Sequence, residues 1–227
     1  AGAADGGSTT AGTVTAAVAA DTTLNAGTLL GNVALTVASN AALTLSASQA
    51  SGKTITGAQA ESGETGGSIV VTGLDGSAAY LLNSLVAGAA NGNTAGSITA
   101  TVAADAILNG ATDLGATVVT VASNAELTLS VSQANGKTIT GATATSGGSH
   151  HGGSVVVTGL DTSAFNLSGL TAGAANGGST TAGTVTAAVA ADLTLNGSAN
   201  LGVTVVTVAS NAELTFCLLY TSPSPRD

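Results

Sequence analysis

The sequence predicts an all-β protein, and more specifically a parallel β-solenoid built from repeats of 84 to 87 residues. Three observations lead to this expectation: a long internal repeat, apolar residues that alternate with polar ones, and a composition that favours strands and turns. Hydrophobic residues make up 44% of the chain but aromatic residues only 2%, so Ala, Val, Leu and Ile supply nearly all of the apolar side chains. Val, Ile and Thr favour strands, while the 32 Gly residues and the many Asn and Ser residues favour turns.

The internal repeat is the strongest of the three signals. The segment 11–21 (AGTVTAAVAAD) returns with small changes at 95–105 and unchanged at 182–192, at successive offsets of 84 and 87 residues. The copies divide the chain into five parts. These are the end of a preceding repeat (1–10), a first repeat (11–94), a second repeat (95–181), a partial third repeat (182–216) and a C-terminal tail (217–227).

Short strands are predicted in order along each repeat. The Ala-rich segment 13–20 fits either a helix or a strand, and we expect a strand because its second copy, 97–102, holds more β-branched residues. Large aliphatic residues recur at every second position, mostly with Ala or Thr between them, in three further segments, which are predicted as half-buried strands: 33–37, 43–45 and 69–71. The segment 46–50, followed by Gly52, predicts one helical turn closed by a glycine.

The length of the stretches between turns favours a solenoid. Each repeat divides into roughly four stretches of about 20 residues, which suits coils that stack about 4.8 Å apart around a narrow interior of small aliphatic side chains. The alternative is tandem Ig-like β-sandwiches, one per repeat, since about seven strands per ~100 residues also fit the length. We favour the solenoid because a sandwich core usually holds bulkier residues, and Tyr80 and Phe165 are the only aromatic residues before position 216.

The two ends of the chain differ from the repeats. Residues 217–227 hold the only Cys, both Pro residues and the only Arg, and they can be encoded by the transposon end and primer site of a widely used sequencing-library adapter. We therefore expect a translated adapter there, a non-native tail that packs against nothing. Residues 1–7 lack the features of a signal peptide and the chain holds no Met, so we expect a truncated, metagenomic-style fragment whose export signal or anchor lies upstream.

Charge and apolar runs argue against several partners. The 12 acidic residues outnumber the 3 Lys and Arg residues, for a net charge of -9. This balance opposes binding to nucleic acid or to anionic lipid, because both need clustered basic residues. The apolar runs are short and broken by Gly, Thr or Asn, so we expect no membrane span. Apart from Cys217 there is no Cys, which excludes disulfides and thiolate metal sites.

One part of the repeat resembles a known class of protein. The segments 43–57 (LTLSASQASGKTITG) and 70–75 (VVTGLD) are similar to the β-strand repeats of bacterial surface proteins of the S-layer and giant-adhesin type. The likeness covers residues 1–216 and concerns the style of the repeat, so it carries no catalytic residues across. It implies an exported protein at the cell surface with a scaffold or adhesive role.

The sequence holds no constellation typical of an enzyme, so we expect no catalytic residues and no cofactor. It has no Gly-x-Ser-x-Gly motif, and its Gly-rich segments lack the Lys of a phosphate-binding loop. The only histidines, His150 and His151, are adjacent in a Gly- and Ser-rich stretch that one repeat alone contains. We expect residues 149–153 to form an exposed, solvated loop.

Acidic residues at one repeat position are the candidate metal ligands. Asp21, Asp105 and Asp192 are weak candidates for calcium, which requires six to eight oxygen ligands. The favoured interpretation is that each Asp accepts a hydrogen bond within its own turn. The Asn residues of a second repeated position are expected to lie in turns that stack between coils: Asn40, Asn124 and Asn211.

The expected function is therefore that of a non-catalytic rigid spacer or lattice element, whose copies pack end to end with one another. The alternative is an adhesive module that binds a receptor or a glycan. We favour the spacer because a binding face usually concentrates aromatic residues or Arg, and this chain has almost none.

Overall fold

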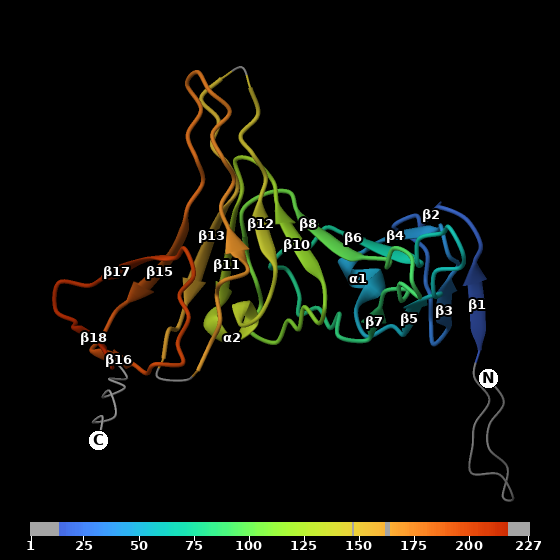
Figure 1. Cartoon of the computed structure of the whole chain (residues 1–227), viewed down its shortest axis with the longest axis horizontal. Coiled ribbons are helices and arrows are strands. Elements are labelled where there is room, and N and C mark those ends of the chain that lie inside the picture. Colours follow the sequence, from blue (N-terminus) through green and yellow to red (C-terminus); the bar gives the residue numbers. More distant parts are fainter. Residues whose placement is uncertain (1–13, 147, 162–163, 218–227) are drawn as a thin grey trace, which may run out of the picture.

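Parallel β-sheets supply nearly all of the regular structure (Figure 1). The computed structural model describes residues 14–146, 148–161 and 164–217, so the segments 1–10 and 218–227 lie outside it. Two four-residue helices, α1 (Ala47–Ala50) and α2 (Val131–Ala134), interrupt the strands. The described strands are β1 (Thr15–Val18), β2 (Thr22–Thr23), β3 (Ala34–Val37), β4 (Ala42–Ser46), β5 (Ile55–Gly57), β6 (Ser68–Thr72), β7 (Leu85–Val86), β8 (Ile98–Val102), β9 (Ala106–Ile107), β10 (Val118–Val121), β11 (Glu126–Ser130), β12 (Ile139–Gly141), β13 (Ser154–Thr158), β14 (Leu170–Thr171), β15 (Val185–Val189), β16 (Leu193–Leu195), β17 (Val205–Val208) and β18 (Leu214–Phe216). The all-β expectation is confirmed.

Most strands pair with the strand two further along the chain. The sheets run β1-β3-β5-β7, then β2 to β14 in even numbers, then β9 to β17 in odd numbers, and finally β16-β18. Every pair among these strands is parallel, with partner residues 19 to 31 positions apart. The series is interrupted after β7 and after β14, which are seven strands apart. Ig-like sandwiches consist of antiparallel sheets, so that alternative is wrong for the described strands.

The predicted alternation places aliphatic side chains between the sheets. In β4, Leu43 and Leu45 are fully buried, and the residues that alternate with them, Ala42, Thr44 and Ser46, are half-buried. The register pairs Leu43 with Ile69 of β6, and Ile69 in turn with Ile98 of β8, so like side chains stack in columns through the interior. Each buried aliphatic side chain of this size stabilises the fold by about 1.5–3 kcal/mol. The strand predictions at 33–37, 43–45 and 69–71 are thus confirmed.

The predicted helical turn is present in both repeats. Ser46 caps α1 and accepts the backbone N–H of Gln49, whose side chain accepts the backbone N–H of Ser46 in return. This reciprocal capping satisfies two N–H groups that a helix start leaves unpaired. Gly52 follows with a φ of +68°, a conformation that favours glycine. Neither helix approaches the length of a membrane span, and no helix in the described residues is long and apolar enough to cross a membrane.

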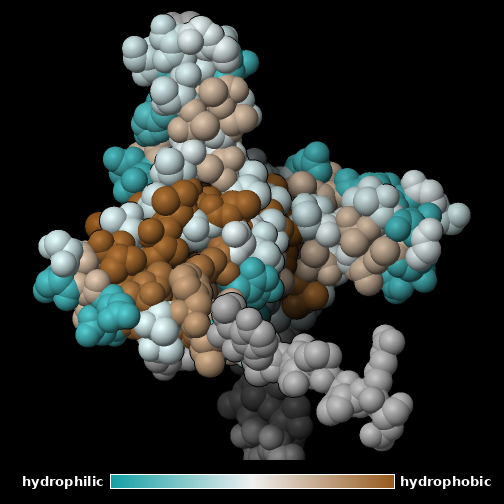
Figure 2. Space-filling view, turned by 60° about the vertical axis from the view of Figure 1, so that its left-hand side comes forward, coloured by the Kyte–Doolittle hydropathy of each residue, from teal (hydrophilic) through white to brown (hydrophobic). Residues whose placement is uncertain are grey.

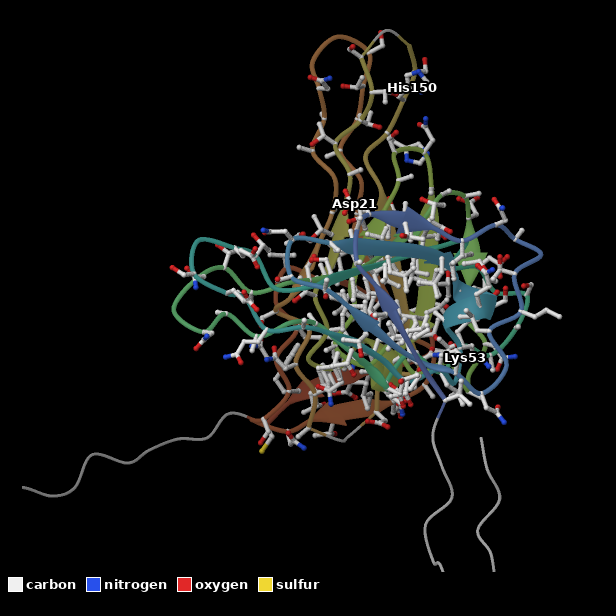
Figure 3. The ribbon with its side chains drawn as sticks, turned by 90° about the vertical axis from the view of Figure 1, so that its right-hand side faces the viewer. Asp21, Lys53 and His150 are labelled. Atoms are coloured by element: carbon white, nitrogen blue, oxygen red, sulfur yellow. The ribbon has the colours of Figure 1, made fainter. Side chains whose placement is uncertain are left out.

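Two pairs of long loops project from the sheets: 58–66 with 87–96, and 142–152 with 172–183. The second pair forms the tall projection of Figure 1, and Figure 3 shows both pairs pointing in different directions. At the base of the first pair, Gly67 donates to Ala58, Gly88 to Gly67 and Gly96 to Gly88, each through backbone atoms 2.9 Å apart. A Cβ atom on Gly88 would lie 1.9 Å from the carbonyl oxygen of Ala58, so these backbones can approach only because the residues are glycines.

The second loop pair corrects the expectation for residues 149–153. Gly152 and Gly153 are buried, since they form the base of the projection, where a Cβ on Gly153 would lie 2.2 Å from a backbone oxygen of Val121. Ser149 and His151 are exposed as expected, but the backbone of His151 pairs with Thr181. The insertion therefore extends a tightly packed base instead of forming a fully solvated loop.

The first residue of the expected non-native tail, Cys217, is the only one that the structure describes. Its side chain is exposed. Its backbone N–H donates to the carbonyl oxygen of Leu195 at 2.9 Å, which continues the pairing of β16 with β18 by one residue.

Candidate functional site

Three equivalent aspartates connect neighbouring turns of the chain. Asp21, Asp105 and Asp192 each follow a strand, and the Oδ1 atom of each accepts the backbone N–H of the residue 21 positions further on at 2.9 Å. These N–H groups lie at or just before the start of β4, β11 and β18, where the pairing with the preceding strand, β2, β9 or β16, has not yet begun. A carboxylate that accepts such a donor satisfies a backbone group that would otherwise depend on water. The expectation of a hydrogen bond within the same turn is therefore wrong.

The same hydrogen bonds limit how these three aspartates could bind calcium. One oxygen of each carboxylate is already engaged with a backbone N–H. Among the residues that the structure describes, no group of three His, Cys, Asp or Glu side chains is placed to hold a metal ion. Calcium binding at Asp21, Asp105 or Asp192 would need backbone carbonyls and waters for most of its six to eight ligands, and it stays a prediction.

A further aspartate closes the turn that follows β6. The Oδ1 atom of Asp75 accepts hydrogen bonds from the Ser77 hydroxyl at 2.7 Å, the Ser77 backbone at 2.9 Å and the Tyr80 hydroxyl at 2.6 Å. These bonds, the Ser77 hydroxyl first, hold the pKa of Asp75 below its usual value. Burial, together with the bond to Asp75, raises the pKa of Tyr80. Asp75 is thus a weaker base than an ordinary Asp, which suits a turn more than proton transfer.

The second repeat shows which part of this cluster the fold requires. Phe165 occupies the position of Tyr80, and both rings are 4% exposed. The buried ring is therefore common to both repeats, whereas the hydroxyl that reaches Asp75 is not.

Asparagines at the second repeated position also connect turns of the chain. Asn40 and Asn124 have φ angles of +57° and +62°, and their Oδ1 atoms accept the backbone N–H of Thr65 and His151 at 2.8 and 2.9 Å. Asn is one of the few residues that tolerate this backbone conformation. Asn40 and Asn124 therefore lie in turns, as expected, and each side chain bonds to the backbone of a segment more than 20 residues further on. Nδ2 of Asn124 also lies 2.8 Å from Nδ1 of His150, so this imidazole is held against the neighbouring turn.

Two buried glutamines are not predicted by the sequence pattern. Gln49 and Gln133 are each 8% exposed and lie in α1 and α2. Besides capping its own helix, Gln49 donates from Nε2 to the carbonyl oxygens of Asn25 at 2.7 Å and Thr28 at 3.1 Å. Gln133 makes the equivalent bonds one repeat later. The Ser-x-x-Gln spacing signals the cap, but the bonds to the preceding loop depend on how the chain turns back on itself.

No protein-family model, curated protein or solved structure shows a significant match to this chain.

Proposed function

We propose that this chain is a non-catalytic structural region of an exported surface protein, in which a parallel β-solenoid of 84- to 87-residue repeats acts as a rigid spacer or lattice element. The observation that carries the proposal is the parallel pairing of each strand with the strand two further on. Such pairing makes successive turns of the chain stack along one axis, so the length of the chain sets the length of the body.

The sequence repeat agrees with the strand pattern. The helices α1 and α2 start 84 residues apart, as do their capping serines Ser46 and Ser130. The sheet series is interrupted after β7 and after β14, so one repeat corresponds to seven strands. With two strands per turn, each repeat supplies about three and a half turns, or an advance of ~17 Å at ~4.8 Å per turn.

The contacts along the axis would resist extension and bending. Neighbouring turns share columns of buried aliphatic side chains, backbone hydrogen bonds, and the side-chain bonds of Asp105, Asn40 and Gln49 to the adjacent turn. Because each turn buries its faces only against its neighbours, stability in such a stack is close to a sum of neighbour interfaces.

The test is to lengthen the chain. A second copy of residues 95–181 inserted after residue 181 should extend the body by ~17 Å in small-angle X-ray scattering, at constant cross-section, and should raise the melting temperature. As a control, a Gly/Ser insertion of the same length should add no rod length and should not raise the melting temperature. An inserted repeat that forms a separate domain with its own melting transition would contradict the solenoid. Labelling of intact expressing cells by an antibody against the chain tests the surface location.

A further inference from the structure

The two lysines of the chain occupy equivalent positions beside the helical turns. Lys53 and Lys137 are half-buried, and their Nζ atoms donate to the carbonyl oxygens of Gly31 and Gly115 at 2.6 Å. Figure 3 shows Lys53 at the outer surface of the molecule near α1. An ammonium has three N–H donors, so each lysine retains two beyond the bond to the carbonyl. In the part of the chain that the structure describes, neither ammonium forms an ion pair with a carboxylate.

Each lysine separates two pockets on the surface. The pockets beside Lys53 measure about 250 and 470 Å3, and those beside Lys137 about 80 and 250 Å3. The walls are made by corresponding residues in the two repeats: Thr28, Ser48 and Gln49 in the first correspond to Thr112, Ser132 and Gln133 in the second. The chain thus presents the same arrangement twice: an ammonium with free donors at the boundary of a concave surface that carries an exposed serine hydroxyl, Ser48 or Ser132.

This chemistry defines a class of ligand. Free donors on a partly desolvated ammonium favour an oxyanion, since a hydrogen bond to a charged group is stronger than a neutral one. The serine hydroxyls on the pocket walls suit a ligand that itself carries several hydroxyls. We propose that each Lys-lined pocket pair binds the carboxylate of an acidic sugar, one per repeat. This binding goes beyond the spacer function and does not depend on it.

The two sites differ in one charge. Asp113 lines the pocket beside Lys137, where the first repeat has Leu29, which is 94% exposed. A carboxylate on the pocket wall repels an anionic ligand. The Lys53 site therefore binds the acidic sugar more tightly than the Lys137 site.

The experiment is a titration of the isotope-labelled full chain with glucuronate, followed by amide chemical shifts around Gly31 and Gly115. Glucose serves as the neutral arm and inorganic phosphate as the arm without a sugar. We expect saturable shifts with glucuronate at both positions, with the lower dissociation constant near Gly31. Glucose should cause no comparable shifts, and phosphate should bind more weakly. Shifts that are equal for glucuronate and glucose, or phosphate binding as tight as that of glucuronate, would overturn the proposal.

Three variants separate binding from folding. Lys53→Met should weaken glucuronate at the Gly31 site at least about tenfold and leave the Gly115 site unchanged, while Lys53→Arg keeps the charge and most of the affinity. Asp113→Asn retains an acceptor for the N–H of Gly115 but removes the charge, so it should strengthen binding at the Lys137 site. The Asp113→Asn result does not depend on whether Lys53→Met folds. Unchanged affinity in a folded Lys53→Met chain, or in Asp113→Asn, would refute the site.

Discussion

A buried threonine at the start of β10 offers a quantitative test of the packing. The hydroxyl oxygen of Thr117 is buried without a hydrogen-bond partner, and so is that of its counterpart Thr204 one repeat later. The first repeat has Val33 at this position, and its backbone N–H makes the same turn bond as that of Thr117, to the residue three positions earlier. Thr117 is only 2% exposed. The substitution Thr117→Val therefore introduces the residue that the fold already accommodates elsewhere.

The expected effect is a gain in stability. Burying an unpaired hydroxyl costs about 1–3 kcal/mol in proteins, and Val fills nearly the same volume with a methyl group. We expect Thr117→Val to raise the free energy of unfolding by about 1 kcal/mol or more. In a chain of this length, such a gain corresponds to roughly 2–4 °C in melting temperature.

Urea unfolding and thermal melts measure the effect, with an unchanged denaturant slope as the sign that only stability has altered. The matched control is Thr101→Val in β8, because Thr101 is exposed and its replacement removes no buried hydroxyl. The control should shift stability by less than about 0.5 kcal/mol. A Thr117→Val chain that unfolds at lower urea than the parent, or that gains no more than the control, would show that the hydroxyl is satisfied and the reasoning wrong.

Four other positions, Gly153, Asp105, Asp75 and Val205, test other contacts. Gly153→Ala would place a Cβ 2.2 Å from a backbone oxygen and should cost more than about 3 kcal/mol by denaturant melt, whereas Gly110→Ala, which meets nothing within 4 Å, should cost little. Asp105→Ala should lose about 1 kcal/mol with the bond to the next turn, and Asp105→Asn, which keeps an acceptor, should lose less. The pKa of Asp75 is lowered in the fold, so its carboxylate contributes to the stability of the fold above the ordinary pKa of 3.8, and this contribution is lost as the pH falls through the lowered, folded pKa. The difference in the free energy of unfolding between the parent and Asp75→Asn should therefore shrink as the pH falls below 3.8. Finally, β17 is an edge strand in which Val205 is 61% exposed, and Figure 2 shows apolar residues gathered over this end of the molecule. We expect sedimentation to detect weak end-to-end oligomers of the parent chain, and Val205→Lys to abolish them. A parent chain that stays monomeric at every concentration would contradict this.

The local features of the fold follow from the sequence because they depend on near neighbours. The alternation of Leu43 and Leu45 with Ala42 and Thr44 is sufficient to place a half-buried strand. The segment 46–50 with Gly52 is sufficient to predict a single helical turn. Parallel pairing was expected because the stretches between turns are short and similar in length.

The contacts between turns could not be predicted, because they depend on how many residues each turn contains. Asp21 reaches a partner 21 positions further on, and Asn40 one 25 positions further on. These separations vary with the loops that each turn inserts, and partner residues in the sheets range from 19 to 31 positions apart. Glycine-rich composition likewise indicates turns, yet Gly88 and Gly153 are needed because backbones from distant segments meet there.

The odd number of strands in a repeat determines where equivalent features appear around the axis. The loop 58–66 leaves β5, which belongs to the four-stranded sheet, but its counterpart 142–152 leaves β12, which belongs to the seven-stranded sheet. Adding a repeat thus transfers this loop from one sheet to another, and Figure 3 shows the two loop pairs pointing in different directions. A filament built from such repeats would display equivalent loops in more than one direction, so a neighbouring filament would meet the same loop on more than one side.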